Sequence, residues 1–120
     1  MVAMGVVGDK SEFGVEGSGI VRRVGSSVDH VQVGQGVVVM GNGILRTRII
    51  LPAGSCLPLP HNLSLADAAT VPCVYATVLY SLVEISKLHQ GQSILIHSAC
   101  GGVGLGAIQL SQMLGAEVCC

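Results

Sequence analysis

The spacing of apolar residues changes along the chain, and these changes mark the elements that the sequence predicts. Residues 20–24 indicate a short strand closed by a glycine turn, and residues 37–40 form a fully apolar strand after another glycine turn. Residues 46–51 alternate charged and bulky side chains, as a half-exposed strand does. Prolines between residues 52 and 60 leave room only for short extended pieces. Several short strands with frequent glycine turns predict a small barrel-like all-β unit over residues 1–61.

From residue 62 the pattern becomes helical. Ser64 and Asp67 have the spacing of a capping box, in which two side chains at a helix start satisfy unpaired backbone groups. Pro72 fits the first turn of a second helix, and apolar residues at helical spacing extend that helix to about Ser86. We expect these two helices, within residues 62–91, to act as a hinge.

Residues 92–120 follow the order strand, glycine turn, helix, strand. An apolar run at 94–96 predicts a buried strand, and a glycine cluster then leads into a helix. The apolar face of that helix is predicted to contain Val103, Ala107, Leu110 and Leu114. Gly115 stands where a left-handed helix cap belongs, and residues 117–120 begin a second strand. This order is that of the opening of a doubly wound parallel sheet.

The glycine turn has the spacing of a dinucleotide-binding fingerprint, with Ala99 at the first position and Gly101 and Gly104 at the others. A helix N-terminus leaves backbone N–H groups unpaired and carries about half a positive charge, which suits a diphosphate. We therefore interpret Gly101, Gly102, Val103 and Gly104 as backbone donors to a cofactor. The alternative is a glycine-rich helix start that only packs closely on a sheet.

Composition narrows the class of protein. The chain has 120 residues, of which 50% are hydrophobic and only 11% charged, whereas a soluble domain normally has about 25% charged residues. We therefore expect a fragment of a larger protein. A net charge of −1 with 2% aromatic residues argues against a nucleic-acid partner. No apolar run reaches the ~18 residues of a membrane span, so no membrane partner is expected.

The five cysteines include no Cys-x-x-Cys pair, which predicts reduced, mostly buried thiols in a cytoplasmic protein. His97 and Cys100 lie three residues apart but have no second pair of ligands, so no metal site is expected. His30, His61 and His89 fall in polar, turn-like stretches and are expected to be solvated.

Three stretches together resemble the medium-chain dehydrogenase/reductase superfamily: GVEGSG at 14–19, AATVP at 68–72 and ACGGVG at 99–104. The longer strings VPCVYATVLYSL and IHSACGGVG resemble, more specifically, the enoyl reductase domain of highly reducing fungal polyketide synthases. The resemblance implies an α/β fold, with the end of a GroES-like β-barrel lobe followed by the start of a Rossmann doubly wound parallel sheet. It places the active site between the two lobes.

The resemblance also implies NADPH as cofactor and a carrier-bound α,β-unsaturated acyl thioester as substrate. The expected partners are the acyl carrier domain and other domains of the same synthase, and a homodimer is compatible with the family. Val15 stands where zinc alcohol dehydrogenases have a histidine ligand, which indicates the zinc-independent branch. As an isolated fragment, the chain is expected to be inactive.

Residues of the second predicted helix are the remaining candidates. By resemblance Thr77 lies near the nicotinamide, although a bond to its own backbone is an equal alternative. Tyr75 is the candidate catalytic proton donor or enolate stabiliser; the alternative is a packed tyrosine with a bonded hydroxyl. Tyr80 is expected in the core. Glu16 is expected to bond backbone N–H groups rather than act as a base.

Two other functions remain open from the sequence. One is a free-standing zinc-free quinone or alkenal reductase, which would share the glycine turn. The other is a non-catalytic nucleotide-binding module, which would bind the cofactor without turning over an enoyl thioester.

Overall fold

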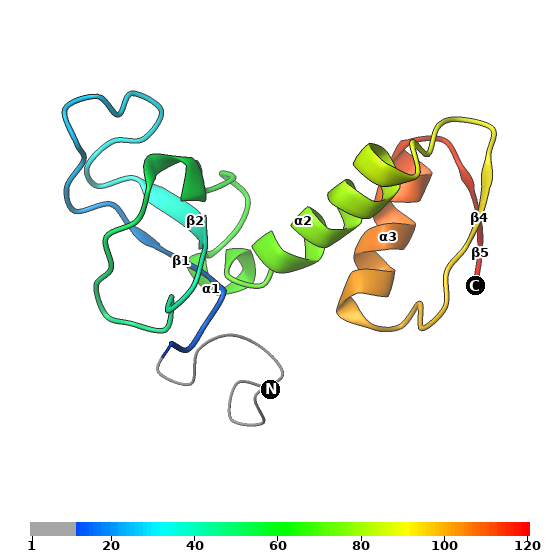
Figure 1. The fold of residues 1–120 in the computed structure, drawn as a ribbon, viewed down its shortest axis with the longest axis horizontal. Helices are drawn as coiled ribbons and strands as arrows, with labels where there is room; N and C mark the ends of the chain where they lie inside the picture. Colours follow the sequence, from blue (N-terminus) through cyan, green and yellow to red (C-terminus); the bar gives the residue numbers. More distant parts are fainter. Residues whose placement is uncertain (1–11) are drawn as a thin grey trace. The chain divides into compact units, whose positions relative to one another are not determined.

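The structure, a computed structural model, describes residues 12–120, and these fall into two units that divide between Cys73 and Val74 (Figure 1). The division lies inside a helix, α2 (Pro72–Leu79). The α/β fold predicted from the sequence is confirmed, because both units combine helices with sheet.

An antiparallel sheet of three strands, in the order β1-β2-β3, organises the first unit. Its strands are β1 (Glu16–Ile20), β2 (Gly36–Met40) and β3 (Cys56–Pro58). The prediction of a strand at 37–40 is confirmed. The strand predicted at 20–24 instead ends at Ile20, because the pairing partner β2 begins opposite it at Gly36.

The strand predicted over residues 46–51 is wrong: no ladder forms there. The N–H of Arg46 donates to the carbonyl of Ile44 at 2.7 Å, which bends the chain out of an extended path. Ile49 and Leu51 still pack against the core of this unit, and this explains their alternation with polar neighbours in an irregular segment.

The core of the first unit lies on one face of β2. Val37 and Val39 point inward from alternate positions of the strand and pack with Val31 and Ile44. Gly17, opposite Val39 on β1, leaves room for Ile44: a Cβ there would lie 2.8 Å from Ile44 Cγ2. The chain then passes through a 3₁₀ turn, η1 (Ala53–Ser55), into β3.

The predicted N-cap at Ser64 is confirmed at the start of α1 (Leu65–Ala68), and Asp67 reaches back to the hydroxyl of Ser64. The N–H of Asp67 donates to Ser64 Oγ at 3.1 Å, and the Ser64 hydroxyl donates to Asp67 Oδ2 at 2.7 Å. The hydroxyl of Ser18 on β1 donates to the Leu65 carbonyl, so α1 is attached to the sheet.

In the second unit, α2 continues into a π-helical segment, η2 (Tyr80–Ile85), so a helix from Pro72 to about residue 86 is confirmed. Tyr80, however, is 63% exposed, and its placement in the core is wrong. Val78 is the buried residue of this stretch, and a side chain two positions later projects about 200° away from it around the helix.

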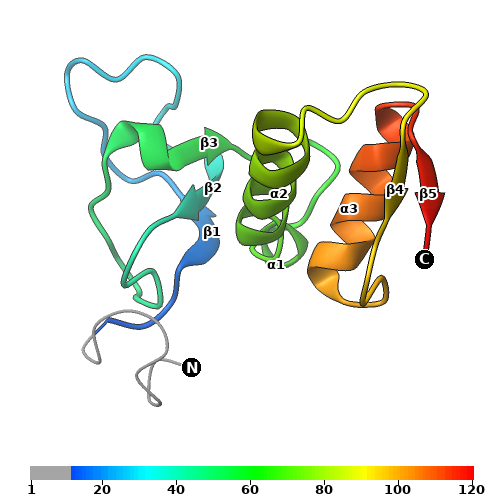
Figure 2. The same ribbon diagram turned by 45° about the vertical axis from the view of Figure 1, so that its right-hand side comes forward.

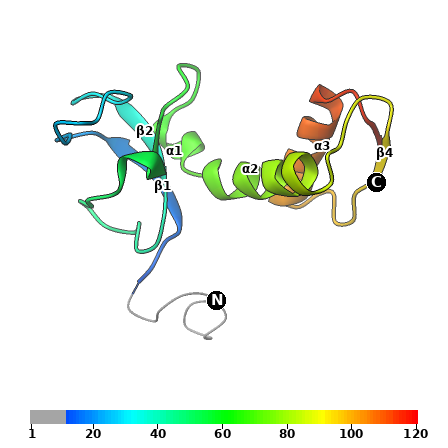
Figure 3. The same ribbon diagram turned by 45° about the horizontal axis from the view of Figure 1, so that its top comes forward.

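The parallel pair β4 (Ser93–Leu95) and β5 (Glu117–Cys119) lies beside α3 (Gly102–Met113) (Figure 2). Figure 3 shows α3 crossing the helical stretch that α2 and η2 form. Side chains from these elements form the second core, which contains Val78, Ile96, Ala107 and Leu110.

The buried face of α3 is rotated from the predicted one. Val103 is 49% exposed, whereas Gly104 and Ser111 are buried together with Ala107 and Leu110. Glycine and serine carry no apolar signal, so the apolar spacing alone pointed to a face that includes Val103. The left-handed cap at Gly115 is confirmed, with φ of +75°.

The expectation of mostly buried thiols is wrong. Cys100, Cys119 and Cys120 are exposed, and Cys56 and Cys73 are half-buried. Among residues 12–120, no helix combines the length and the apolar character needed to cross a bilayer.

Candidate cofactor-binding site

The turn between β4 and α3 is held by a backbone hydrogen bond at one end and by packing on the second core at the other. The N–H of Ile96 donates to the Cys119 carbonyl at 2.9 Å, which extends the strand pairing up to the turn. Ser98 then adopts a left-handed φ of +57°, a conformation that few residues other than glycine take. Ala99 follows and packs against the second core. The turn is therefore a rigid reversal of the chain.

Gly101 closes this reversal and starts the helix. Its N–H donates to the Ser98 carbonyl at 3.0 Å, and its own carbonyl accepts from Leu105 N–H at 2.8 Å. Gly101 is the N-cap of α3 and provides no side-chain cap. Its N–H is committed to the turn, so Gly101 shapes the site and does not offer a free donor.

Three backbone donors remain at the mouth of α3. Within residues 12–120, the N–H groups of Gly102, Val103 and Gly104 have no hydrogen-bond partner, as expected for the first turn of a helix. This turn also contains no acidic side chain that would neutralise the positive end of the helix dipole. The mouth is therefore suited to an anion with several acceptor oxygens.

Gly104 allows the helix to start this close to the turn. A Cβ at this position would lie 2.5 Å from the Ser98 carbonyl oxygen and 2.7 Å from Ala99 Cα. Those atoms belong to the backbone of the turn and cannot rotate away as a side chain could. The third glycine of the fingerprint is thus required by close packing, whether or not a ligand is present.

α2 packs against the same end of α3. A Cβ at Gly106 would lie 2.9 Å from Val74 Cγ1, and a Cβ at Gly102 would lie 3.6 Å from Val74 Cγ2. Gly106 therefore admits Val74 to the surface of α3, while Gly102 has ordinary van der Waals space. The glycines at the start of α3 therefore fall into two groups: Gly104 and Gly106 are needed for close packing, whereas Gly101 and Gly102 have space for a Cβ.

The two polar candidates on α2 lie in different surroundings. The hydroxyl of half-buried Tyr75 donates to Oε1 of Gln109 on α3. Thr77 is exposed, and it also has an interaction partner. The Tyr75 hydroxyl is thus bonded to a side chain.

His97 and Cys100 flank the turn and are exposed. In the part of the chain that the structure describes, no group of three or more His, Cys, Asp or Glu side chains is placed to hold a metal ion.

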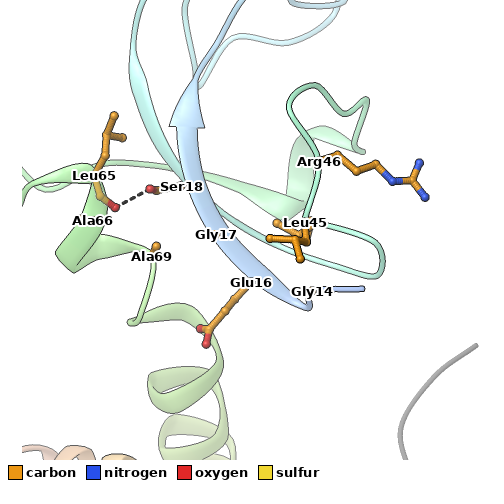
Figure 4. A pocket seen from close by; sticks show the side chains of 10 residues that line it. Gly14, Glu16, Gly17, Ser18, Leu45, Arg46, Leu65, Ala66 and Ala69 are labelled. Atoms are coloured by element: carbon orange, nitrogen blue, oxygen red, sulfur yellow. Dashed lines mark hydrogen bonds between the residues drawn. The ribbon is translucent and has the colours of Figure 1, made fainter. Parts of the chain in front are cut away.

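A shallow pocket of about 510 Å³ lies in the first unit between β1, α1 and the segment after β2 (Figure 4). Two of its polar groups are already bonded, since Ser18 donates to Leu65 and the Glu16 carboxylate accepts from the N–H of Cys73. The guanidinium of Arg46 points away from the other labelled side chains (Figure 4). The pocket thus presents no reactive group, and the turn before α3 is the better candidate.

Sequence reasoning missed the partners of three polar residues. Gln109 accepts a hydrogen bond from the Tyr75 hydroxyl. Glu16 accepts from a backbone N–H, as expected, but that N–H belongs to Cys73, 57 positions further along the chain. His30, expected to be solvated, places Nε2 3.1 Å from the Ala53 carbonyl and 3.2 Å from the Cys56 carbonyl. No local pattern could have found these pairs, because the fold alone brings the partners together.

Comparison with known proteins supports the resemblance. No protein-family model matches the chain. The chain is 49% identical over 121 residues to the highly reducing polyketide synthase lcsB of Purpureocillium lilacinum, and the match covers 100% of this chain but 5% of the synthase. It superposes on the CurK enoyl reductase with a TM-score of 0.81 and 36% identity, covering 88% of this chain and 32% of the reductase.

The chain belongs to the medium-chain dehydrogenase/reductase superfamily. The resemblance stated from the sequence is confirmed. A further member of known structure, a mycobacterial protein solved in complex with NADPH, matches with a TM-score of 0.77 and 30% identity over 88% of this chain and 34% of that protein.

Proposed function

We propose that this chain forms part of an NADPH-dependent enoyl reductase that reduces the α,β-double bond of a carrier-bound polyketide thioester. The observation that carries the proposal is the open mouth of α3, where three unpartnered N–H groups converge at a turn that Gly104 keeps tight. Similarity to polyketide synthases and to a solved enoyl reductase supports the choice of reaction.

The residues present fit a dinucleotide. A diphosphate brings negative charge and several acceptor oxygens, which match unpaired amides at the positive end of a helix without a competing carboxylate. Gly102, Val103 and Gly104 would hold the diphosphate, while Ala99 and Gly101 shape the turn beneath it. When bound, NADPH supplies the hydride for the β-carbon of the alkene, and a proton then completes the α-carbon.

Thr77 and Tyr75 are proposed for the reacting end of the site. Thr77 would contact the nicotinamide, and Tyr75 would donate the proton or stabilise the enolate. In the structure the Tyr75 hydroxyl donates to Oε1 of Gln109, so this hydrogen bond must break before the hydroxyl can donate to a substrate. In this structure the Tyr75 hydroxyl is therefore occupied by the neutral side-chain amide of Gln109.

The remaining assignments follow from the synthase relatives. We propose residues 1–61 as part of the GroES-like substrate lobe, 62–91 as the hinge and 92–120 as the opening of the Rossmann lobe. The partners would be the acyl carrier and neighbouring domains of a cytoplasmic, zinc-independent synthase, with a homodimer as its assembly. The 120 residues by themselves would bind the diphosphate but would not turn over an enoyl thioester.

Amide chemical shifts test the cofactor site directly. NADPH titrated into the ¹⁵N-labelled chain should move the amide signals of Gly102, Val103 and Gly104 most, and inorganic pyrophosphate should move the same signals. Adenosine, which has no phosphate, is the matched control and should leave them in place. If NADPH shifts other amides and leaves these three unchanged, the site is elsewhere.

The role of Tyr75 is tested in a full-length synthase that carries this segment. A proton donor contributes about 10²- to 10⁴-fold to the rate, so Tyr75→Phe should lower kcat by at least about 100-fold. Turnover within about threefold of wild type would remove Tyr75 from the chemistry.

A further inference from the structure

The side chain of Gln109 lies on the same helix as the proposed phosphate-binding amides, and it contacts α2 instead of a ligand. Its Oε1 accepts the hydrogen bond from Tyr75, although the two residues are 34 positions apart in the chain. Gln109 is exposed and Tyr75 is half-buried, so this bond lies at the rim of the packing between α2 and α3. It joins two uncharged groups.

A second contact joins the same helices nearer the mouth. Val74, the neighbour of Tyr75, lies over Gly102 and Gly106, with Val74 Cγ1 only 2.9 Å from where a Cβ of Gly106 would be. Gln109 lies further along α3 than either glycine. At 1.5 Å per residue, Gln109 and Gly102 are separated by about 10 Å along the helix axis.

Two contacts at different positions along a helix limit its rotation more than one contact does. The other contacts that hold α3 against α2 are apolar, namely Val74 against the two glycines and the second core, and apolar contact has no directional preference. A hydrogen bond is directional and prefers a nearly straight geometry. The Tyr75–Gln109 bond therefore adds a directional restraint to this packing, and it acts on the rotation of α3 and on the direction in which the amides of its first turn point.

We infer that Gln109 is a positioning residue for cofactor binding, acting through Tyr75 to aim the first turn of α3 at the diphosphate. The inference rests on the proposed function, since the aim of these amides matters only if a diphosphate binds there. Gln109 itself does not contact the ligand in this arrangement. Its amide oxygen also sets which way the Tyr75 hydroxyl points.

The chain provides its own spectroscopic probe for this bond. It has two tyrosines and no tryptophan, so a Tyr80→Phe background leaves Tyr75 as the single fluorescent reporter. Because Tyr80 is 63% exposed, we expect this change to leave the fold intact. Tyrosine emission is quenched when the hydroxyl donates to a carbonyl or carboxylate, so emission reports whether the bond is formed.

Three variants in this background separate positioning from packing. Gln109→Met keeps the length of the side chain and removes the acceptor, Gln109→Glu keeps an acceptor, and Gln112→Met is the matched control on the exposed surface of the same helix. The probe ligand is inorganic pyrophosphate at about 0.15 M salt, where the Debye length of about 8 Å screens the added carboxylate from the first turn.

Gln109→Met should raise the Tyr75 emission and weaken pyrophosphate binding by about three- to tenfold, the effect of losing one net hydrogen bond. Gln109→Glu should keep the emission quenched and restore binding to within about twofold of wild type. Gln112→Met should change neither quantity. Rescue by glutamate is the result that a purely structural role of the methylene groups would not give.

The inference is overturned if Gln109→Met binds pyrophosphate as tightly as wild type, or if its Tyr75 emission does not change. Those results would leave the proposed function intact. If the wild-type chain binds no pyrophosphate, the proposed function fails first and the positioning role fails with it. Far-UV circular dichroism of each variant, with the helical signal of wild type, shows that the comparison is made on the same fold.

Discussion

The carboxylate of Glu16, on β1, accepts a hydrogen bond from the backbone N–H of Cys73, in the first turn of α2, at 2.8 Å. The first N–H groups of a helix have no intrahelical partner, and they form its positive end. Glu16 therefore caps α2 from 57 positions away along the chain, and does so with a charge of the favourable sign.

Removing this cap should destabilise the chain. Glu16→Ala is expected to lower the free energy of unfolding by about 1 kcal/mol, the usual effect of losing an N-terminal cap. Glu16→Gln keeps an acceptor and should cost only the charge–dipole part, about 0.3–1 kcal/mol. Urea unfolding followed by circular dichroism measures both. Glu12→Gln, at an exposed position outside the strand, is the control, and a Glu16→Ala variant as stable as this control would contradict the capping role.

Gly104→Ala should loosen the turn before α3. The added Cβ would lie 2.5 Å from the Ser98 carbonyl oxygen, so the helix must move away from the turn, at a cost of about 1–3 kcal/mol. Gly102→Ala is the matched control on the same turn, because its Cβ meets Val74 at an ordinary 3.6 Å and alanine favours a helix by up to about 1 kcal/mol. The midpoint temperature of thermal unfolding should therefore fall for Gly104→Ala and rise for Gly102→Ala. Equal destabilisation by both would argue against a special requirement at Gly104.

Ser111→Ala should stabilise the chain. Ser111 is completely buried on α3, and its hydroxyl has no hydrogen-bond partner among the described residues. An unsatisfied buried polar group costs about 1–3 kcal/mol, and alanine is also the better helix former. We expect the free energy of unfolding, measured in urea, to rise by about 1 kcal/mol. A loss of comparable size would show that the hydroxyl has a partner such as a buried water.

The thiol of Cys56 should react more slowly than the exposed thiols. Burial raises the pKa of the Cys56 thiol above its ordinary value, because desolvation disfavours the thiolate. At about pH 8, alkylation by iodoacetamide followed by mass spectrometry should therefore label Cys100 before Cys56, since the thiolate is the nucleophile. Equal rates for the two sites in the folded chain would contradict this assignment.

The same shift in pKa gives the stability a defined pH dependence. Well below the ordinary thiol pKa, the Cys56 thiol is protonated in both the folded and the unfolded chain, so the favourable contribution is fully present. As the pH rises through that ordinary pKa, the unfolded chain releases the proton first, and the free energy of unfolding falls until the folded thiol also ionises. Cys56→Ser should remove this part of the decline, which urea unfolding at a series of alkaline pH values measures.

Several features of this chain could be predicted because their causes are local. Ser64 is the N-cap that its spacing to Asp67 indicates, and α2 begins at Pro72. The strand, turn and helix around Gly101 and Gly104 also follow the glycine spacing. In each case residues within a few positions supply both the group and its partner, so the pattern is visible in the sequence.

Features that depend on distant partners were predicted less well. Glycine-rich β1 became a strand because β2 pairs with it, whereas residues 46–51 had the right alternation and no partner strand among the described residues. Val103 faces outward because Gly104 and Ser111, which carry no apolar signal, provide the close-packed face of α3.

The sequence by itself determined the α/β order of elements, the family and the location of the proposed phosphate-binding turn, because these depend on short-range spacing. Only the tertiary structure decided which donors of that turn are free, since the N–H of Gly101 donates to Ser98. It alone also paired Tyr75 with Gln109 and Glu16 with Cys73. Hydrogen bonds are directional and short, so their partners are known only once the chain has brought distant residues to within about 3 Å of each other.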